Sequence, residues 1–292
     1  KLPYGGEYFT APVVLSDEVI RIMERDIAGD GFPICRFMDW IKVYTSAFPD
    51  VQMLLAFETS FFTRLPEREF LYGIDIDLAR KFKLRKYGLH GLFHEAAYNF
   101  ARGKLNIREN RNCLKIMSIC LDAKSEVAAI NGGKPLMVSS GMTSLEGLPG
   151  EMSCGKIDPA LIFDILSDKE YSLEEIDVML GKTSGFLALA GKKVSLPEVL
   201  AEDKAEYRFA AKVFLYHLLQ ACGAAIAAMG GIDAVVFAGC YVECGSQVAE
   251  WLRDAMKQSV RSILAVPQLL YRESIDEILF KYASYLLMSQ RK

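Results

Sequence analysis

Residues 223–239 read GAAIAAMGGIDAVVFAG, and this stretch decides the fold class. The first half has the small, apolar composition of a helix packed against a neighbour, and Gly230-Gly231 marks its end, since glycine adopts the left-handed conformation of a helix terminus at little cost. The second half contains a short apolar run, 234–237, typical of a strand buried on both faces. A buried helix followed directly by a buried strand indicates an α/β protein.

The residues that follow continue this alternation. We expect a helix over 246–260, a strand over 262–266 and a last helix over 274–288, whose start is marked by the capping-box spacing of Ser274 and Glu277. Because β and α elements alternate, the sequence predicts a mostly parallel sheet covered by helices.

Further upstream, the segments 114–121 and 127–130 have the pattern of a strand pair. The sequence Asn131-Gly132-Gly133 comes directly after them and is a strong turn signal. Ser172 with Glu175, and Ser195 with Glu198, again have capping-box spacing, and Asp158-Pro159 is a favourable helix start.

The N-terminal part contains two amphipathic segments and a short apolar run. We expect helices over 13–27, with Ser16 or Asp17 near its start, and over 37–48. The run VQMLLAF at 51–57 predicts a buried strand, and Glu58-Thr59-Ser60 follows it. Polar residues at the carboxyl end of such a strand lie where open α/β sheets bind ligands.

The composition bounds the class of protein. A chain of 292 residues is long enough for two domains, and 51% hydrophobic with 24% charged residues is typical of a globular protein and excludes disorder. The net charge is −3 with no basic tract, which argues against a nucleic-acid partner.

One segment, 209–231, is long and apolar enough to cross a membrane. Lys212, His217 and Gln220 interrupt it, and each is costly in hydrocarbon. We therefore expect a buried helix and no membrane partner. The first residues, KLPYGGEYF, lack the apolar run of a signal peptide, which favours the cytoplasm.

The seven cysteines point to the same compartment. An odd number with no close-set framework fits reduced thiols better than disulfides. Cys240 and Cys244 are four residues apart, which is not the spacing of a CxxC hook, so the sequence predicts no metal ligands.

Six segments, in order along the chain, resemble acetate kinases. They are YGGEYFT (4–10), FETSFFTRLP (57–66), RKYGLHGLFH (85–94), GMTSLEGLPGEMSCGKIDP (141–159), KTSGFLALAG (182–191) and the opening stretch, 223–239. The resemblance implies an α/β fold of two ribonuclease-H-like domains of the acetate kinase, Hsp70 and actin type. It further implies that residues 1–60 are the remainder of the N-terminal domain, rejoined by the C-terminal helix 272–292, and that residues 61–271 form the second domain.

The resemblance also implies a reaction and its participants. Acetate kinases transfer a phosphoryl group reversibly between ATP and acetate with Mg²⁺, giving acetyl phosphate. A small carboxylate and a nucleotide would then be the partners, ATP and Mg²⁺ the cofactors, and a homodimer the assembly. Such transfer requires cations and hydrogen-bond donors around the moving phosphoryl group.

Several of these positions have changed at the start of the chain. The family's first hairpin precedes the segment resembling YGGEYFT and is not in this sequence. Either it precedes residue 1 in the native protein or the protein lacks it, and we expect the first domain to be incomplete here. The family's substrate-site arginine falls on Lys1, and the histidine of its His-Gly-Gly motif falls on Tyr4. Lysine keeps the charge of arginine but not its planar fork.

The two catalytic candidates are Glu58 and His90. Glu58 replaces the family's catalytic aspartate and extends the carboxylate by one bond of about 1.5 Å; the alternative is a carboxylate that only caps a turn. His90 matches the histidine that steadies the transferring phosphoryl group, and His94 a second, substrate-site histidine. The alternatives are a helix-start histidine held by backbone contacts, and half of a metal site formed at i, i+4 spacing.

The remaining family positions have lost their charges or glycines. The second arginine clamp becomes Ser153, and the phosphate loop becomes 120–124, CLDAK, in which Asp122 adds repulsion and Lys124 either offsets it or is a solvated surface lysine. The adenosine-contacting residues become 195–197, SLP, and of the nucleotide-binding glycine turn only Gly239 remains. The metal-associated acidic pair falls on Leu270 and Tyr271, with Glu273 close by.

These replacements lead to one main hypothesis and two alternatives. The main hypothesis is a degenerate acetate kinase relative, weakly active or inactive, with a binding or assembly role and no obligatory cofactor. The first alternative is an active acetate- or propionate-type kinase whose site is completed by a missing segment or a partner. The second is a sensor that binds a small molecule around Glu58 and His90 without chemistry.

Overall fold

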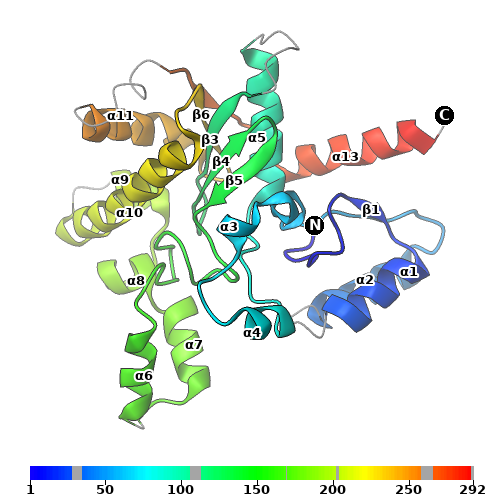
Figure 1. Cartoon of the computed structure of the whole chain (residues 1–292), viewed down its shortest axis with the longest axis horizontal. Helices are drawn as coiled ribbons and strands as arrows, with labels where there is room; N and C mark the ends of the chain where they lie inside the picture. The colour runs from blue at the N-terminus through cyan, green and yellow to red at the C-terminus, as the bar shows by residue number, and fades with distance from the viewer. Residues whose placement is uncertain (28–34, 106–112, 169, 202–203, 258–265, 291–292) are drawn as a thin grey trace.

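The computed structural model describes residues 1–27, 35–105, 113–168, 170–201, 204–257 and 266–290. At its centre lies a five-stranded sheet in the order β5-β4-β3-β6-β7. The strands are β3 (Lys115–Cys120), β4 (Glu126–Asn131), β5 (Lys134–Val138), β6 (Ala234–Ala238) and β7 (Gln268–Leu270). In Figure 1 the sheet stands between α5 on one side and the α9–α11 group on the other.

The predicted mostly parallel sheet is wrong, because the sheet is mixed. β3 pairs with β6, and β6 with β7, in parallel, whereas β3 with β4 and β4 with β5 are antiparallel. The turn Asn131-Gly132-Gly133 returns the chain directly, with φ of 57° at Gly132 and 79° at Gly133. Only glycine takes two such angles in succession without strain, so the predicted turn is confirmed.

Both faces of the sheet are buried, which explains the apolar runs in its strands. On β3, Met117 and Ile119 face a core formed with α8 to α11, and Ile116 and Cys120 face a second core formed with α5 and α13. This alternation follows from the two-residue period of a strand.

Helices cover both of these faces. α10 (Ala205–Met229) and α11 (Gly245–Met256) lie on one side, and α5 (Gly91–Lys104) and α13 (Ile275–Gln290) on the other. α10 ends at Gly230 with φ of 64°, as predicted. The strand predicted over 262–266 lies almost wholly outside the described residues.

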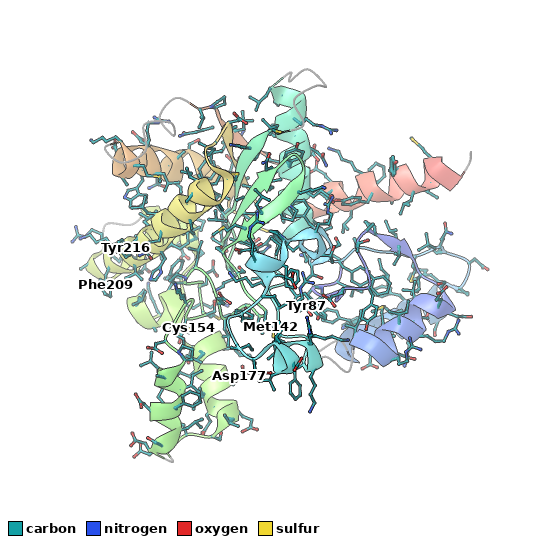
Figure 2. All side chains as sticks on the ribbon, in the orientation of Figure 1. Tyr87, Met142, Cys154, Asp177, Phe209 and Tyr216 are labelled. Atoms are coloured by element: carbon teal, nitrogen blue, oxygen red, sulfur yellow. The ribbon has the colours of Figure 1, made fainter. Side chains whose placement is uncertain are left out.

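α10 is the one described helix that is long and apolar enough to span a membrane. Phe214, Leu218 and Cys222 on its inner face are buried in the core with β4. Phe209 and Tyr216 lie on its outer side (Figure 2) and are more than half exposed. The helix therefore packs as the predicted core helix.

A chain of shorter helices follows the sheet hairpin. They are α6 (Ala160–Ser167), α7 (Leu173–Lys182), α8 (Gly185–Ala190) and α9 (Leu196–Ala201), and α6 and α7 project away from the sheet (Figure 1). The capping box of Ser172 and Glu175 is present at the start of α7, which confirms that prediction.

The N-terminal part has its own core and a small sheet of β1 (Val13–Val14) and β2 (Leu54–Leu55). The helix predicted over 13–27 begins later, because residues 13–14 pair with β2: Ser16 caps α1 (Asp17–Ile22), and a π-helix, Met23–Ile27, continues it. The second predicted helix is α2 (Cys35–Ala47). The strand predicted over 51–57 is limited to β2 and a bridge between Leu2 and Phe57.

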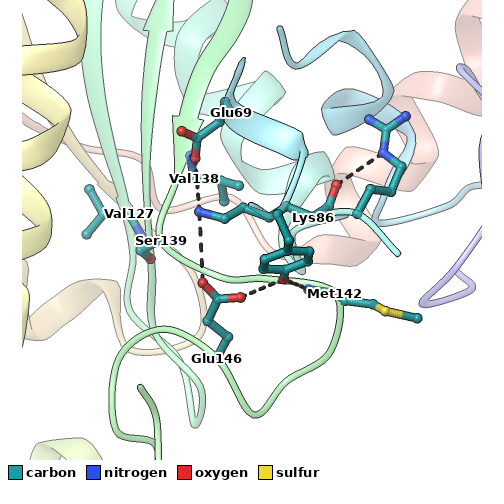
Figure 3. A network of polar contacts seen from close by, with 9 residues as sticks. Glu69, Lys86, Val127, Val138, Ser139, Met142 and Glu146 are labelled. Carbon is teal, nitrogen blue, oxygen red and sulfur yellow. Dashed lines mark hydrogen bonds and ion pairs between the residues drawn. The ribbon is translucent and has the colours of Figure 1, made fainter. Parts of the chain in front are cut away.

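Two short helices, α3 (Glu67–Phe70) and α4 (Ile76–Lys81), lead towards α5. Figure 3 shows how this segment holds the loop after β5. Lys86 Nζ lies 3.3 Å from Glu69 Oε1 and 3.9 Å from Glu146 Oε1. Tyr72 donates to Glu146 Oε2 at 2.6 Å and accepts from the Met142 N–H at 2.9 Å. The loop that contains Ser153 is thus fixed by ionic and hydrogen-bonded contacts.

Candidate active site

The predicted site residues gather where several chain segments end. Glu58 follows the bridge at Phe57, His90 precedes α5, Asp122 follows β3, and Gly239 follows β6. Because β3 and β6 are parallel neighbours, the loops after them meet at one edge of the sheet. The start of α5 packs against the same edge, so the structure brings together the carboxyl ends of the strands and a helix N-terminus.

Glu58 is buried and is held from two sides. Lys1 Nζ lies 2.9 Å from its Oε1, and the Leu92 N–H donates to its Oε2 at 3.4 Å. Partial burial on its own lowers the pKa of the Lys1 side chain. The pairing with Glu58 outweighs this effect, so the pKa is raised. The structure thus places two predicted residues, Lys1 and Glu58, in direct contact.

The backbone at Glu58 also fixes the start of α5. The Gly91 N–H donates to the Glu58 carbonyl at 3.0 Å, and a β-carbon on Gly91 would lie only 2.1 Å from that oxygen. Glycine is therefore required for this approach of helix to strand end.

His90 lies at the N-cap of α5 and is partly exposed. Its Nε2 is 2.8 Å from the carbonyl oxygen of Lys124. Because a carbonyl can only accept, Nε2 carries a proton, and Nδ1 holds the lone pair when the ring is neutral. His90 is therefore anchored by a backbone contact while its side chain remains partly exposed.

His94, one turn further on, has no exposed surface. Its Nδ1 lies 2.8 Å from Ser118 Oγ and its Nε2 lies 3.1 Å from Glu126 Oε1. Both ring nitrogens are thus bonded inside the protein, behind His90. A substrate-binding role for His94 stays a prediction, and in this structure the side chain supports the helix from within.

Glu126 is the residue on which these contacts converge, and the sequence did not reveal it. It is fully buried, its Oε2 accepts the Leu89 N–H at 2.9 Å, and its Oε1 accepts the His90 N–H at 3.0 Å. Burial by itself would raise its pKa, but the hydrogen bond from His94 and the charges of His94 and His90 lower it to about 2. A glutamate at the head of the apolar run 126–130 was the one signal that pointed to it.

The loop after β3 stands at the position expected for the family's phosphate loop, and its lysine is bound to backbone carbonyls. Lys124 Nζ donates to the Leu148 carbonyl at 2.5 Å and reaches the Leu145 carbonyl at 3.5 Å. Burial lowers the pKa of Lys124 to about 8. The lysine therefore fastens the loop around Leu148 and offers no charge to a phosphate.

Ser153 lies in that fastened loop and is nearly buried. Its carbonyl accepts the Gly150 N–H at 3.0 Å, and a β-carbon on Gly150 would lie 2.6 Å from its Oγ. Ser153 brings no charge to the cleft.

Gly239 turns the chain after β6 with φ of 95°, and a β-carbon there would lie 2.4 Å from the Leu121 carbonyl. Tyr241 follows it and donates to Glu151 Oε1 at 2.7 Å, an oxygen that also accepts the Leu196 N–H at 3.3 Å. Burial and the bond to Glu151 raise the pKa of Tyr241. The segments around residues 196 and 241 are therefore tied to one another.

Two cysteines, Cys120 and Cys240, lie near carboxylates at this end of the sheet. Burial and the Asp122 carboxylate raise the pKa of the exposed Cys240 thiol to about 11. Burial, followed by Asp122 and Glu126, also raises the pKa of the Cys120 thiol. The six cysteines whose side chains the structure describes are all free thiols.

This mixed sheet between helical layers, with a site at the strand ends, is an α/β fold. Solved structures with the same fold include an acetate kinase from Porphyromonas gingivalis (TM-score 0.83, 24% identity, 98% of this chain and 76% of that one). They also include a propionate kinase from Francisella tularensis (TM-score 0.80, 24% identity, 88% and 66%). The predicted acetate kinase type of fold is confirmed.

Sequence comparisons agree with the fold. The model of the acetokinase family matches residues 1–260, and the acetate kinase of Thermoanaerobacterium thermosaccharolyticum is 32% identical over 263 residues, which are 88% of this chain. The chain belongs to the acetokinase family. It spans 65% of the length of that relative.

Proposed function

We propose that this chain is a degenerate acetokinase in which phosphoryl transfer is lost or strongly impaired, and that it acts through binding or assembly. The observation that carries the proposal is the position of Glu126. Backbone N–H groups at a helix start form a ready site for an anion, and at the start of α5 those of Leu89 and His90 donate to the protein's own carboxylate.

Charge in the cleft supports the same proposal. The carboxylate of Asp122 belongs to the loop at the position of the family's phosphate loop, and Lys1 is already paired with Glu58. Lys124 is bound to backbone carbonyls. A transferring phosphoryl group needs cations and donors at this point, and carboxylates repel it.

Nucleotide binding is disfavoured as well. The segments that replace the family's adenosine contacts are bonded to each other through Glu151, which joins Leu196 and Tyr241. These bonds occupy groups that a nucleotide at this position would have to compete for. We therefore propose that neither ATP nor Mg²⁺ is an obligatory cofactor.

Exposed aromatic side chains support the assembly part of the proposal. Trp40 and Tyr44 on α2, and Phe280 and Tyr285 on α13, are each at least half exposed. Apolar surface of this kind is typical of interaction faces. We propose a homodimer, with residues 1–60 and the C-terminal segment 272–292 as one domain and residues 61–271 as the other, and a reducing compartment such as the cytoplasm.

A second candidate is an active acetate- or propionate-type kinase. It is favoured by the presence of Glu58, His90 and Lys1 around one cleft and by the names of the relatives, which are acetate and propionate kinases. ATP, Mg²⁺ and a small carboxylate would then be its cofactors and substrate.

The two candidates differ in turnover. We expect the full-length gene product, given ATP, Mg²⁺ and acetate or propionate, to form acyl phosphate at least about 10⁴-fold more slowly than the Porphyromonas gingivalis enzyme, because two arginine clamps are gone and each lost donor costs roughly 10²–10³-fold. Trapping the product as a hydroxamate measures it. Turnover within tenfold of the control enzyme, and its loss in His90→Ala, would establish the second candidate and reject the first.

A further inference from the structure

Three side chains with metal-binding atoms meet at the edge of the cleft. The ligand atoms of His90, Cys120 and Asp122 all lie within 4.8 Å of one another. They come from the start of α5, the end of β3 and the loop after it, so the fold, not local sequence, brings them together. We propose that this cluster binds a zinc ion, with Cys240 as the fourth ligand.

The donor types select zinc from the common divalent cations. Thiolate, imidazole and carboxylate together form the usual ligand set of Zn²⁺. Mg²⁺ takes oxygen ligands almost exclusively and holds several waters, so two sulfurs and a ring nitrogen do not suit it.

The distances require only a small adjustment. With bonds of about 2.0–2.3 Å in a tetrahedron, the ligand atoms of a zinc site lie about 3.3–3.8 Å apart. The present limit of 4.8 Å exceeds that by about 1.0–1.5 Å per pair at most. Asp122 is partly exposed after the strand, and its Oδ1 accepts the Ala123 N–H at 2.7 Å, so the second carboxylate oxygen is the one offered to an ion.

His90 is already oriented as a zinc-bound histidine would be. Its Nε2 donates to the Lys124 carbonyl at 2.8 Å, which leaves the Nδ1 lone pair for a metal. Metal-bound histidines usually donate their other ring N–H to a carbonyl or carboxylate, which fixes the ring and its tautomer. The hydrogen bond from His90 to the Lys124 carbonyl would therefore also hold His90 in the orientation of a metal ligand.

Cys240 directly follows Gly239, the glycine after β6, and stands outside the group of three side chains whose ligand atoms meet. The Cys120 sulfur lies 2.9 Å from the place where a β-carbon of the neighbouring Gly239 would stand. The glycine turn thus brings the loop with Cys240 up to the sulfur of Cys120.

The surrounding charge also favours a cation. Glu58 and Glu126 act electrostatically on Cys120, as does Asp122. Binding Zn²⁺ would release the thiol protons of Cys120 and Cys240 to solvent and leave two thiolates, one carboxylate and a neutral imidazole around the ion. The inference rests on the proposed function, because an ion on His90 would occupy the place of a transferring phosphoryl group.

Cobalt(II) titration of the chelator-treated, reduced protein, without nucleotide, tests the site. We expect one equivalent of Co²⁺ to give thiolate-to-cobalt charge-transfer absorption and tetrahedral visible bands, both abolished by one equivalent of Zn²⁺. Cys120→Ser and His90→Ala should each weaken Zn²⁺ binding at least about 100-fold in a chelator competition, the upper range seen even for outer supports. Cys240→Ser should reduce the charge-transfer intensity while some binding remains.

Cys113→Ser, which removes an exposed thiol outside the cluster, is the matched control and should bind like the unmodified chain. Circular dichroism of each metal-free variant verifies folding. A wild-type chain without charge-transfer absorption, or a folded Cys120→Ser variant that keeps it, overturns the zinc site. If the protein does not bind zinc and also forms no acyl phosphate, the metal inference fails and the proposed function stands. If the protein binds zinc and forms acyl phosphate rapidly, the proposed function fails and the zinc site stands.

Discussion

Replacing Glu126 with alanine is expected to lower the free energy of unfolding by about 3–5 kcal/mol, the range found when one partner of a buried ionic contact is removed. The carboxylate accepts hydrogen bonds from two backbone N–H groups, of Leu89 and His90, and from the buried ring of His94. In the alanine variant these donors lose their buried acceptor. Urea unfolding of the metal-free protein measures the change.

The pH dependence of the free energy of unfolding offers a second test of the Glu126 carboxylate. The pKa of Glu126 is about 2 in the folded protein, below the ordinary range near 4.3 of an unfolded chain. The stabilisation is therefore complete above about pH 4.3 and is lost as the pH falls towards 2, with a total on the order of 3 kcal/mol. Glu126→Gln should be less stable at neutral pH and should lose less on acidification. Equal slopes for both proteins below pH 4.3 would remove Glu126 from this role.

Exposed Glu174, in the first turn of α7, provides the control. Glu174→Ala changes the same residue type at the surface, and we expect a change within about 0.5 kcal/mol. A loss at Glu126 no larger than at Glu174 would show that the buried carboxylate does not hold the start of α5.

Gly91→Ala is expected to separate α5 from the strand end that contains Glu58. An added β-carbon would lie 2.1 Å from the Glu58 carbonyl and 3.0 Å from the Phe61 side chain, and the first of these is backbone that cannot rotate away. Overpacking of this kind costs about 1–3 kcal/mol and sometimes more. We expect a loss at the upper end of that range, measured by thermal or urea unfolding.

Gly103 lies on the same helix and makes the comparison direct. A β-carbon on Gly103 has no atom within 4 Å, so Gly103→Ala should be neutral or stabilising by up to about 1 kcal/mol, from helix propensity alone. If both alanine variants behave alike, the close approach at Gly91 does not constrain the site.

Local signals predicted the helices and turns well, for identifiable reasons. Gly230, the Asn131-Gly132-Gly133 turn and the Ser172 capping box depend on residues close in sequence, and all three are present. The N-terminal segment was harder. The apolar residues at 13–14 continue a helical pattern, but they pair with β2, and that pairing depends on residues far along the chain.

The candidate site was predictable only in part. Glu58 and His90 stand in motifs, so their positions could be inferred from a resemblance. Glu126 and Cys120 come from apolar strands and acquire their surroundings from α5 and from the loop after β6. His90 and Cys120 are 30 residues apart and come together only in the fold. Their spacing along the sequence matches no metal-binding motif, which is why the sequence predicted no metal ligands.

Calorimetric titration of the full-length protein with ATP and Mg²⁺ tests the loss of the phosphotransferase site most directly. With Glu126 on the helix-start donors and Tyr241 bonded to Glu151, we expect no saturable heat and a Kd weaker than about 1 mM, beyond the usual range of enzyme substrates. A one-site isotherm with a micromolar Kd, weakened in His90→Ala, would show that the cleft still accepts nucleotide and would contradict a degenerate site.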